Sequence, residues 1–418
     1  MTDRRQITSP PSALERRAVR GWVIYYWANS AFTTTVMAGF FPIFFKGYWS
    51  YGVNANLSTA RLGIANAVAG LIIALLAPVL GAMADSAGLR KRLLIFFAYL
   101  GVITTAALFL IQQGQWLLAA ACYVLATVGF SGGNIFYDAL LAHIAPAHRI
   151  HVVSGMGFAF GYLGGGLLLL FNVVMTLSPH SFGLPDAQTA VRWSFLTVAL
   201  WWGLFSVLTI LWVPPDPKPL RSAALAATIK DGLQRVAATL TNLRRQKTIL
   251  FFLIGYWFYI DGVDTIIRMA VDYGLALGFH SNDLIVALLV VQFVGFPAAL
   301  VFGRVGQRWG ALRAVYAAIV IYMAVTVWGV MIDKKIEFYI LAVAIGLVQG
   351  GVQSLSRSLY ARLIPVDKAA EFFGFFNMVG KFATLLGPLL LALTPLVIPG
   401  AGPRDSILSL SLLFIPGA

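Results

Sequence analysis

The sequence predicts an all-α polytopic membrane protein made of two six-helix bundles that are related by pseudo-two-fold symmetry. Three observations carry this prediction: an apolar composition, a succession of bilayer-length apolar segments and an internal repeat. Of the 418 residues, 59% are hydrophobic and only 11% are charged, and the mean hydropathy is +0.82. A soluble domain carries about 25% charged residues, so this chain must expose apolar surface to lipid.

The remaining composition excludes some classes of protein. The net charge is +14, but the basic residues lie between apolar segments and not on one compact face, so we expect no nucleic-acid partner. Cys122 is the single cysteine, which leaves the redox compartment open. The polar, basic N-terminus lacks an apolar core followed by a small-residue cleavage site, so the first apolar segment is predicted to act as an uncleaved insertion signal.

Apolar segments define the predicted helices, because about 20 consecutive apolar residues cross a bilayer as a helix. A final run begins near Ile407 and is still apolar at Ala418, so we expect the last helix to be incomplete. The other predicted spans are 22–45, 62–84, 93–112, 115–140, 153–176, 192–213, 248–275, 283–303, 314–332, 336–361 and 372–398.

The positions of Lys and Arg predict the orientation, because these residues concentrate in cytoplasmic loops. With the N-terminus inside, the outside segments hold only Lys46, Arg61, Arg192, Lys334, Lys335 and Arg404. We therefore expect a multi-pass protein of a bacterial inner (plasma) membrane with a cytoplasmic N-terminus. The long inside segment 214–247 would join an N-terminal bundle, 1–213, to a C-terminal bundle, 248–418. Its helical spacing over 223–243 favours a membrane-surface helix, which is either a plain linker or a regulatory helix.

An internal repeat relates the two bundles. GAMADSAGLRKR follows the second span and GRVGQRWGALR follows the eighth, so that Gly81, Asp85, Gly88 and Lys91 align with Gly303, Gln307, Gly310 and Arg313. Two related halves joined by a cytoplasmic segment are the layout of transporters with parallel repeats. The other aligned pairs are Asn29 with Asp261, Thr33 with Thr265, Asp138 with Arg357, Pro146 with Pro365, Gly155 with Gly374, and Tyr162 with Lys381.

These loops resemble the Gly–x3–Asp–x2–Gly–basic signature of the major facilitator superfamily. More narrowly, YWANSAFTTTV, FYIDGVDTIIRMA, QFVGFPAALVFGR, GLVQGGVQSLSRSLYARLIP and EFFGFFNMVGKFATLLGP resemble the branch of the yeast vacuolar amino-acid effluxer and its bacterial relatives. The resemblance covers nearly the whole chain. It departs at Tyr26, where we expect the family to carry Asp, so an acidic role for the first helix is in doubt.

The resemblance implies a secondary transporter that moves a small solute by alternating access, with amino acids or related metabolites as the leading substrates and efflux as the direction. We expect no enzyme activity and no cofactor, and a monomer in the lipid bilayer that handles a small molecule and protons. The rival hypotheses are an exporter of drugs or amphipathic metabolites and a lipid flippase or scramblase. Fold alone does not decide between them.

Charged residues within spans are candidate functional residues, because burying a charge in a bilayer is unfavourable. Asp261, Asp264 and Arg268 share one face of the seventh predicted span. Asp261 or Asp264 would bind a proton or a cationic substrate group; the alternative is a structural Asp264–Arg268 salt bridge. Lys381 lies roughly 13 Å of helical rise into the eleventh span. It would bind a substrate carboxylate or pair with Asp261, unless it reaches the membrane interface.

Uncharged polar and aromatic residues complete the predicted substrate site. Each amide or hydroxyl either lines a cavity or bonds to a neighbouring helix, and each tyrosine either stacks on substrate or lies at the membrane interface. These candidates are Asn29, Thr33, Tyr256, Tyr259, Gln292, Gln353 and Asn377.

A second group of residues is predicted to form a gate at the cytoplasmic side. We expect Asp138 to pair with Arg90 or a neighbouring basic residue, and Arg357 to lie near the segment between the eighth and ninth spans. Such pairs would latch the cytoplasmic side and break on opening. Asp85 is expected near a helix N-terminus, where its charge is favourable. The signature residues in this group are Gly81, Gly88, Lys91, Gly303, Arg308, Gly310 and Arg313.

Two further patterns concern packing and metals. The glycines of GMGFAFGYLGGG allow close helix contact, and Gly387-Pro388 predicts a kink in the eleventh span. His143, His148 and His151 flank one loop; we interpret it as an ordinary basic loop, and we expect no metal site. The sequence contains no nucleophile–base arrangement and no nucleotide-binding motif.

Overall fold

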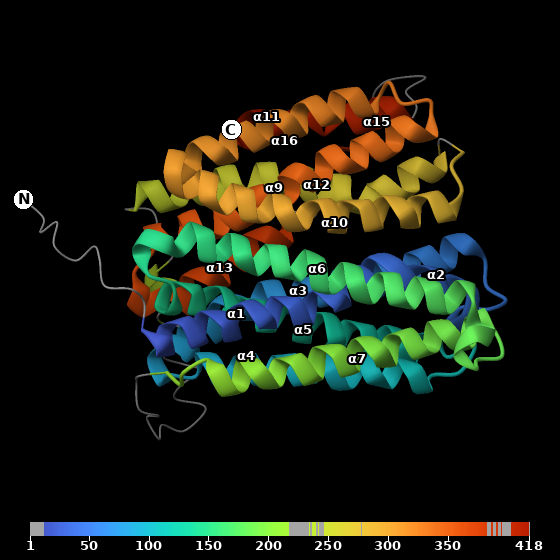
Figure 1. The fold of residues 1–418 in the computed structure, drawn as a ribbon, viewed down its shortest axis with the longest axis horizontal. Helices are drawn as coiled ribbons and strands as arrows, with labels where there is room; N and C mark the ends of the chain where they lie inside the picture. Colours follow the sequence, from blue (N-terminus) through green and yellow to red (C-terminus); the bar gives the residue numbers. More distant parts are fainter. Residues whose placement is uncertain are drawn as a thin grey trace, which may run out of the picture.

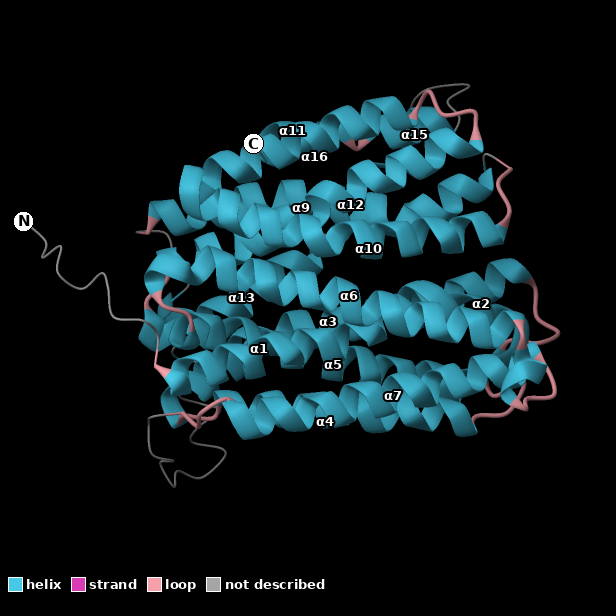
Figure 2. Ribbon diagram, viewed as in Figure 1, coloured by secondary structure: helices cyan, strands magenta, loops and turns pink. Residues whose placement is uncertain are grey.

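The computed structural model describes residues 12–216, 234, 236–239, 241, 246–276, 278–382, 386–387, 390–391, 394 and 403–417. Every regular element within these residues is helical (Figure 2). Nine helical stretches in this part of the chain are long and apolar enough to cross a membrane. One of them, Asp283–Gly329, contains the eighth predicted span and most of the ninth.

The elements follow the predicted order. The first half contains α1 (Ala13–Ala31), continued by η1 (Phe32–Phe40), α2 (Phe41–Phe44) and η2 (Phe45–Trp49), then α3 (Ala55–Ala87), α4 (Arg90–Ala107), η3 (Leu108–Leu110), α5 (Trp116–Ile144), η4 (Ala147–Arg149), α6 (Ile150–Leu177), η5 (Pro179–Phe182) and α7 (Ala187–Trp212). The second half contains α9 (Lys247–Ala276), α10 (Ser281–Val305), η6 (Gly306–Gly310), α11 (Ala311–Gly329), α12 (Lys335–Leu363), η7 (Val366–Lys368), α13 (Ala369–Phe382), α15 (Pro403–Ser409) and α16 (Ser411–Gly417).

Helix ends depart from the predicted boundaries where polar residues cap them. The first helix begins at Ala13 and not near residue 22, because Ser12 and Glu15 form a capping box. The Glu15 amide donates to Ser12 Oγ at 3.1 Å and the Ser12 amide to Glu15 Oε2 at 2.7 Å. These bonds satisfy amides that have no partner inside the helix. The predicted surface helix over 223–243 and the end of the eleventh span lie largely outside the described residues.

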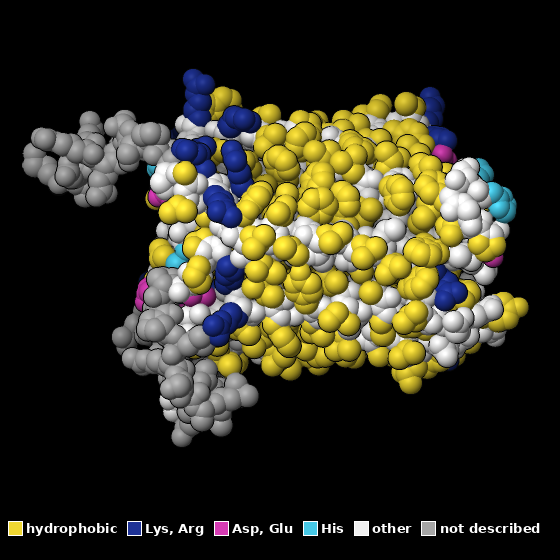
Figure 3. All heavy atoms as spheres, turned by 60° about the horizontal axis from the view of Figure 1, so that its bottom comes forward, with side chains coloured by type: hydrophobic (Ala, Val, Ile, Leu, Met, Phe, Trp, Pro, Cys, Tyr) yellow, Lys and Arg dark blue, Asp and Glu magenta, His cyan; other side chains and the backbone are white. Residues whose placement is uncertain are grey.

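The outer surface is apolar around its middle. Leu75, Ile103 and Leu204 are 64%, 65% and 68% exposed. On the face seen in Figure 3, hydrophobic side chains cover the middle of the molecule, and most Lys and Arg side chains gather at one end. This pattern matches a lipid-facing belt with a basic rim.

Figure 1 shows α1 to α7 lying together as one group, and α9 to α12 with α15 and α16 as a second group. We count α13 with the second group, which it follows in the chain, although it packs against α3 of the first. We call the end where α1, α4, α6, α11 and α13 begin and where α3, α5, α7, α10 and α12 end the linker face; it lies on the left in Figure 1. The gating candidates lie toward this face, close to those helix ends or in η6.

Two close helix crossings join the groups near the linker face. Where α3 crosses α13, a Cβ on Gly81 would overlap the carbonyl oxygen of Ala370, and one on Gly374 would lie 2.5 Å from that of Ala77. Where α6 crosses α10, a Cβ on Gly155 would lie 2.7 Å from the Ala299 carbonyl oxygen. Gly81 and Gly374 are the repeat equivalents of Gly303 and Gly155, so both crossings use matching positions.

Gly81→Val should therefore weaken the closed linker face. Overpacking a tight contact costs about 1–3 kcal/mol, and α13 must move away to make room. The reporter is the distance between spin labels on Ala147→Cys and Val366→Cys, which are exposed positions of η4 and η7, in a Cys122→Ser background. The control is Gly70→Val on the same helix, where a Cβ would meet nothing within 4 Å. Equal distance distributions in the two variants would contradict the expected effect.

Candidate functional site

A buried ion pair connects the two helix groups. Arg357 of α12 is 2% exposed and Asp138 of α5 is 7% exposed. The Arg357 guanidinium donates to Asp138 Oδ1 at 3.1 Å, to Ser154 Oγ at 3.0 Å and to the Ser154 carbonyl oxygen at 3.0 Å. Asn377 of α13 donates to Asp138 Oδ2 at 3.4 Å. Four helices, α5, α6, α12 and α13, therefore meet at one polar point.

Aromatic rings surround this arginine. The Arg357 guanidinium carbon lies 4.5 to 5.5 Å from the ring centroids of Trp22, Tyr26, Tyr137 and Phe158. Each π face attracts the cation, and more strongly where water is excluded. Tyr26, the position where we expected the family to carry an acid, thus supplies a ring to the cation and also stacks on Tyr137 at 5.3 Å.

The predicted pairing of Asp138 with Arg90 or a neighbouring basic residue is wrong, because the partner of Asp138 comes from the other half of the chain. Asp138 pairs with Arg357, while Arg90 pairs with Asp85 at 2.7 Å and Asp216 at 3.2 Å. Asp138 and Arg357 are aligned in the repeat, and equivalent positions near a pseudo-two-fold axis can face each other. The sequence supplied the alignment, but not which helices approach that axis.

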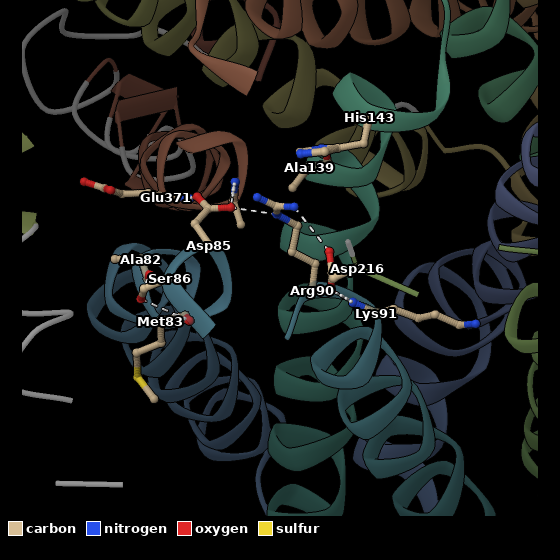
Figure 4. Close-up of polar contacts among 11 residues, drawn as sticks. Ala82, Met83, Asp85, Ser86, Arg90, Lys91, Ala139, His143, Asp216 and Glu371 are labelled. Carbon is tan, nitrogen blue, oxygen red and sulfur yellow. Dashed lines mark hydrogen bonds and ion pairs between the residues drawn. The ribbon is translucent and has the colours of Figure 1, made fainter. Parts of the chain in front are cut away.

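Asp85 forms the second connection between the groups (Figure 4). Its Oδ1 accepts from the Ala370 amide at 3.1 Å, and its Oδ2 accepts from the Glu371 amide at 2.8 Å. These are amides of the first turn of α13, so the prediction that Asp85 lies near a helix N-terminus is confirmed. The carboxylate satisfies amides with no partner inside the helix and faces the positive end of the helix dipole.

The two signature segments share a glycine with a positive φ but not their contacts. Gly88 has φ +67° and Gly310 has φ +96°, a region that favours glycine. Arg308 and Arg313 are exposed, as is Gln307, which replaces Asp85 in the second copy. Beside the second crossing, a different set of bonds forms instead: His151 Nδ1 lies 2.7 Å from Ser358 Oγ, and His151 Nε2 lies 3.3 Å from Arg362.

Asp261 of α9 is fully buried and holds two helices together. Its Oδ1 accepts from Thr265 Oγ1 at 3.2 Å and from the Gly387 amide at 2.9 Å, and its Oδ2 accepts from the Leu386 amide at 2.9 Å. Two successive amides of the eleventh span therefore donate to a side chain next to the predicted Gly387-Pro388 kink. Asp264 and Lys381 are half-buried, and the side chain of Arg268 lies outside the described residues.

The uncharged candidates fall into two groups. Several bond to neighbouring helices: Asn29 Nδ2 donates to Asn134 Oδ1 at 2.8 Å, and the Tyr259 hydroxyl lies 2.6 Å from Ser356 Oγ. Tyr256 stacks on Phe376 with centroids 4.1 Å apart. By contrast, Gln292 and Gln353 are half-buried and Thr33 is exposed. The structure thus brings Asn377 to the Asp138–Arg357 pair and Thr265 to Asp261.

Some contact residues were missed from the sequence. Ser154, Asn134 and Asp216 each contact a candidate, and only a polar residue in or beside an apolar span could have indicated them. Among the residues that the structure describes, no group of three or more His, Cys, Asp or Glu side chains could hold a metal ion.

Hydrogen bonds between the two groups occupy one half of the bundle. Within the described residues, the hydrogen bonds that join a residue up to 216 to one from 246 onward come from side chains and helix ends toward the linker face. These bonds involve Asp85, Asp138, His151, Ser154, Ser354, Arg357, Ser358, Arg362, Ala370, Glu371 and Asn377. The linker face is therefore closed.

Comparisons with known proteins agree with this architecture. Residues 58–394 match the family described as vacuole effluxer Atg22 like. The chain is 38% identical over 398 residues to the uncharacterized MFS-type transporter YxiO of Bacillus subtilis, covering 95% of this chain and 92% of the relative. It is 23% identical over 395 residues to autophagy-related protein 22 of Yarrowia lipolytica, covering 74% of this chain and 66% of that protein.

Solved structures show the same fold. The human organic anion transporter MFSD10 (TETRAN) superposes with a TM-score of 0.71 at 16% identity, covering 98% of this chain and 99% of that structure. The chain therefore belongs to the Atg22-like vacuole effluxer family and is a multi-pass membrane transporter of the major facilitator superfamily.

Proposed function

We propose that this chain exports an amino acid or a related small metabolite by alternating access, and that proton movement drives the export. The observation that carries the mechanism is that, among the residues that the structure describes, the hydrogen bonds between the two groups lie toward the linker face. A carrier of this kind exposes a central site to one side at a time, by rocking its two halves. The polar contacts close one side and would have to break for the other state.

In this proposal the linker face is cytoplasmic, as the distribution of Lys and Arg predicts. The conformation of the structure is then closed to the cytoplasm. The family is described as vacuole effluxer Atg22 like, and efflux is the part of that description that this proposal carries over to the chain. The direction is tested together with the substrate.

Proton coupling is assigned to Asp261. Its carboxylate accepts three hydrogen bonds from described residues, two of them from backbone amides of the eleventh span. Protonation turns one oxygen into a donor and makes the group a weaker acceptor, which would weaken the bonds from that helix. Loading a proton would thereby change the fit between α9 and the eleventh span.

A zwitterion is the proposed cargo because α9 and α13 each carry a charged residue of opposite sign within a predicted membrane span. Asp264 and Lys381, both half-buried, would contact the ammonium and the carboxylate of an amino acid.

Purified protein in proteoliposomes tests the proposal. We expect uptake of at least one labelled amino acid, increased by a pH gradient of one sign and reduced by the reverse gradient. Empty liposomes control for leakage. If all amino acids are inactive and a fluorescent lipid probe moves between leaflets, a lipid flippase or scramblase is the correct function. If only amphipathic drugs move, the protein is a drug exporter.

A further inference from the structure

We propose that Asp216, the first acidic residue after α7, is a positioning residue that holds Arg90 and thereby keeps Asp85 on the N-terminus of α13. The inference rests on the alternating-access part of the proposed function. It adds that the junction between α7 and the long inside segment sets how firmly the linker face stays closed.

The contacts place Asp216 in the same network as the closing bond (Figure 4). Arg90 is 2% exposed. Its Nε donates to Asp85 Oδ1 at 2.7 Å, and its Nη1 donates to Asp216 Oδ1 at 3.2 Å. The other oxygen of Asp216 accepts from the Lys91 amide at 3.2 Å. One buried guanidinium is thus shared between a residue that touches the second group, Asp85, and a residue at the end of α7.

The local sequence holds Asp216 in place. Pro214 and Pro215 separate it from the end of α7, and proline fixes φ and disfavours the helical region in the residue before it. The Lys91 ammonium also donates to the Val213 carbonyl oxygen at 2.6 Å. The segment 213–216 is therefore attached to the start of α4 by three hydrogen bonds, from Arg90 and from the amide and ammonium of Lys91.

Charge explains why this attachment affects closure. Asp85, Arg90 and Asp216 together carry one net negative charge, and Asp85 presents it to the positive end of the α13 dipole. Without the charge of Asp216, Arg90 neutralises Asp85 alone, and its second donor is free to compete with the Ala370 and Glu371 amides for the same two oxygens. Both changes weaken the bond from Asp85 to α13.

Asp216→Asn should change the distance between spin labels on Ala147→Cys and Val366→Cys in the Cys122→Ser protein. We expect the ratio of long to short distances to rise about fivefold or more, the lower end of typical coupling between two sites. Asp216→Glu keeps the charge and should restore most of the short distance. An unchanged distribution in Asp216→Asn would overturn the proposal.

Two controls separate positioning from simple support of the fold. Lys91→Met removes the ammonium bond to Val213 but leaves the Arg90 network, so it should shift the ratio far less; an equal shift would assign the effect to a loosened α7 end and overturn the proposal. In an Asp85→Asn background, Asp216→Asn should add little, because it acts through Asp85. Full additivity would contradict that route.

The distances need no substrate, so the two proposals fail separately. Amino-acid flux together with an unchanged Asp216→Asn distribution removes the role of Asp216 and leaves the proposed function. A shifted distribution in a protein that moves no amino acid supports the role of Asp216 and removes the proposed cargo.

Discussion

Asp261→Asn is expected to abolish proton-driven accumulation of substrate while leaving exchange of substrate between the two sides partly intact. The amide of asparagine does not titrate, so the variant cannot load and release a proton during the cycle. It is close in size to aspartate, and its oxygen can still accept one of the amides of Leu386 and Gly387 that now donate to Asp261. The rocking of the two halves is therefore retained.

The measurement is labelled-substrate transport in proteoliposomes, with and without a pH gradient, compared with counterflow at equal pH on both sides. Thr265→Val is the matched control, because it removes one hydrogen bond to Asp261 and keeps the carboxylate. Accumulation in Thr265→Val should persist. Wild-type accumulation in Asp261→Asn would remove Asp261 from the coupling mechanism, and loss of both activities would make it a structural residue.

Asp138→Asn should give the largest loss of stability among the substitutions considered. It leaves the Arg357 guanidinium buried without a counter-charge, and breaking a buried ion pair typically costs about 3–5 kcal/mol. The surrounding rings and Ser154 compensate only in part. The lost ion pair stabilises the closed linker face. The variant should therefore unfold at a lower temperature and populate the open state more.

A double replacement distinguishes the pair from either residue alone. Asp138→Asn combined with Arg357→Met removes both charges and should recover most of the melting temperature, since an apolar replacement of a buried pair is often neutral. Arg92→Ala, at an exposed arginine near the same face, should change it little. Equal melting temperatures for the single and double variants would show that Arg357 needs no counter-charge, against the expectation.

The candidate site could be predicted in its residue types and only partly in its contacts. The pseudo-symmetric alignment put Asp138 opposite Arg357 in sequence, yet the predicted partner of Asp138 was wrong. Gln307 aligns with Asp85 but is exposed, and His151, Ser358 and Arg362 make the polar contacts beside the second crossing. Alignment reports common ancestry of positions, while contacts depend on the crossing of helices distant in the chain.

The sequence by itself determined the membrane class, the order of the helices and the repeat. It also indicated glycines that lie where helices cross. These follow from local properties: apolar length, the positive φ that glycine allows at Gly88 and Gly310, and residue size at Gly81. Only the tertiary structure decided the partners of the buried charges. Asp85 meets amides 285 and 286 positions away in the chain, and Arg90 meets an aspartate beyond α7, because a buried charge selects whichever donor the packing of the helices brings within reach.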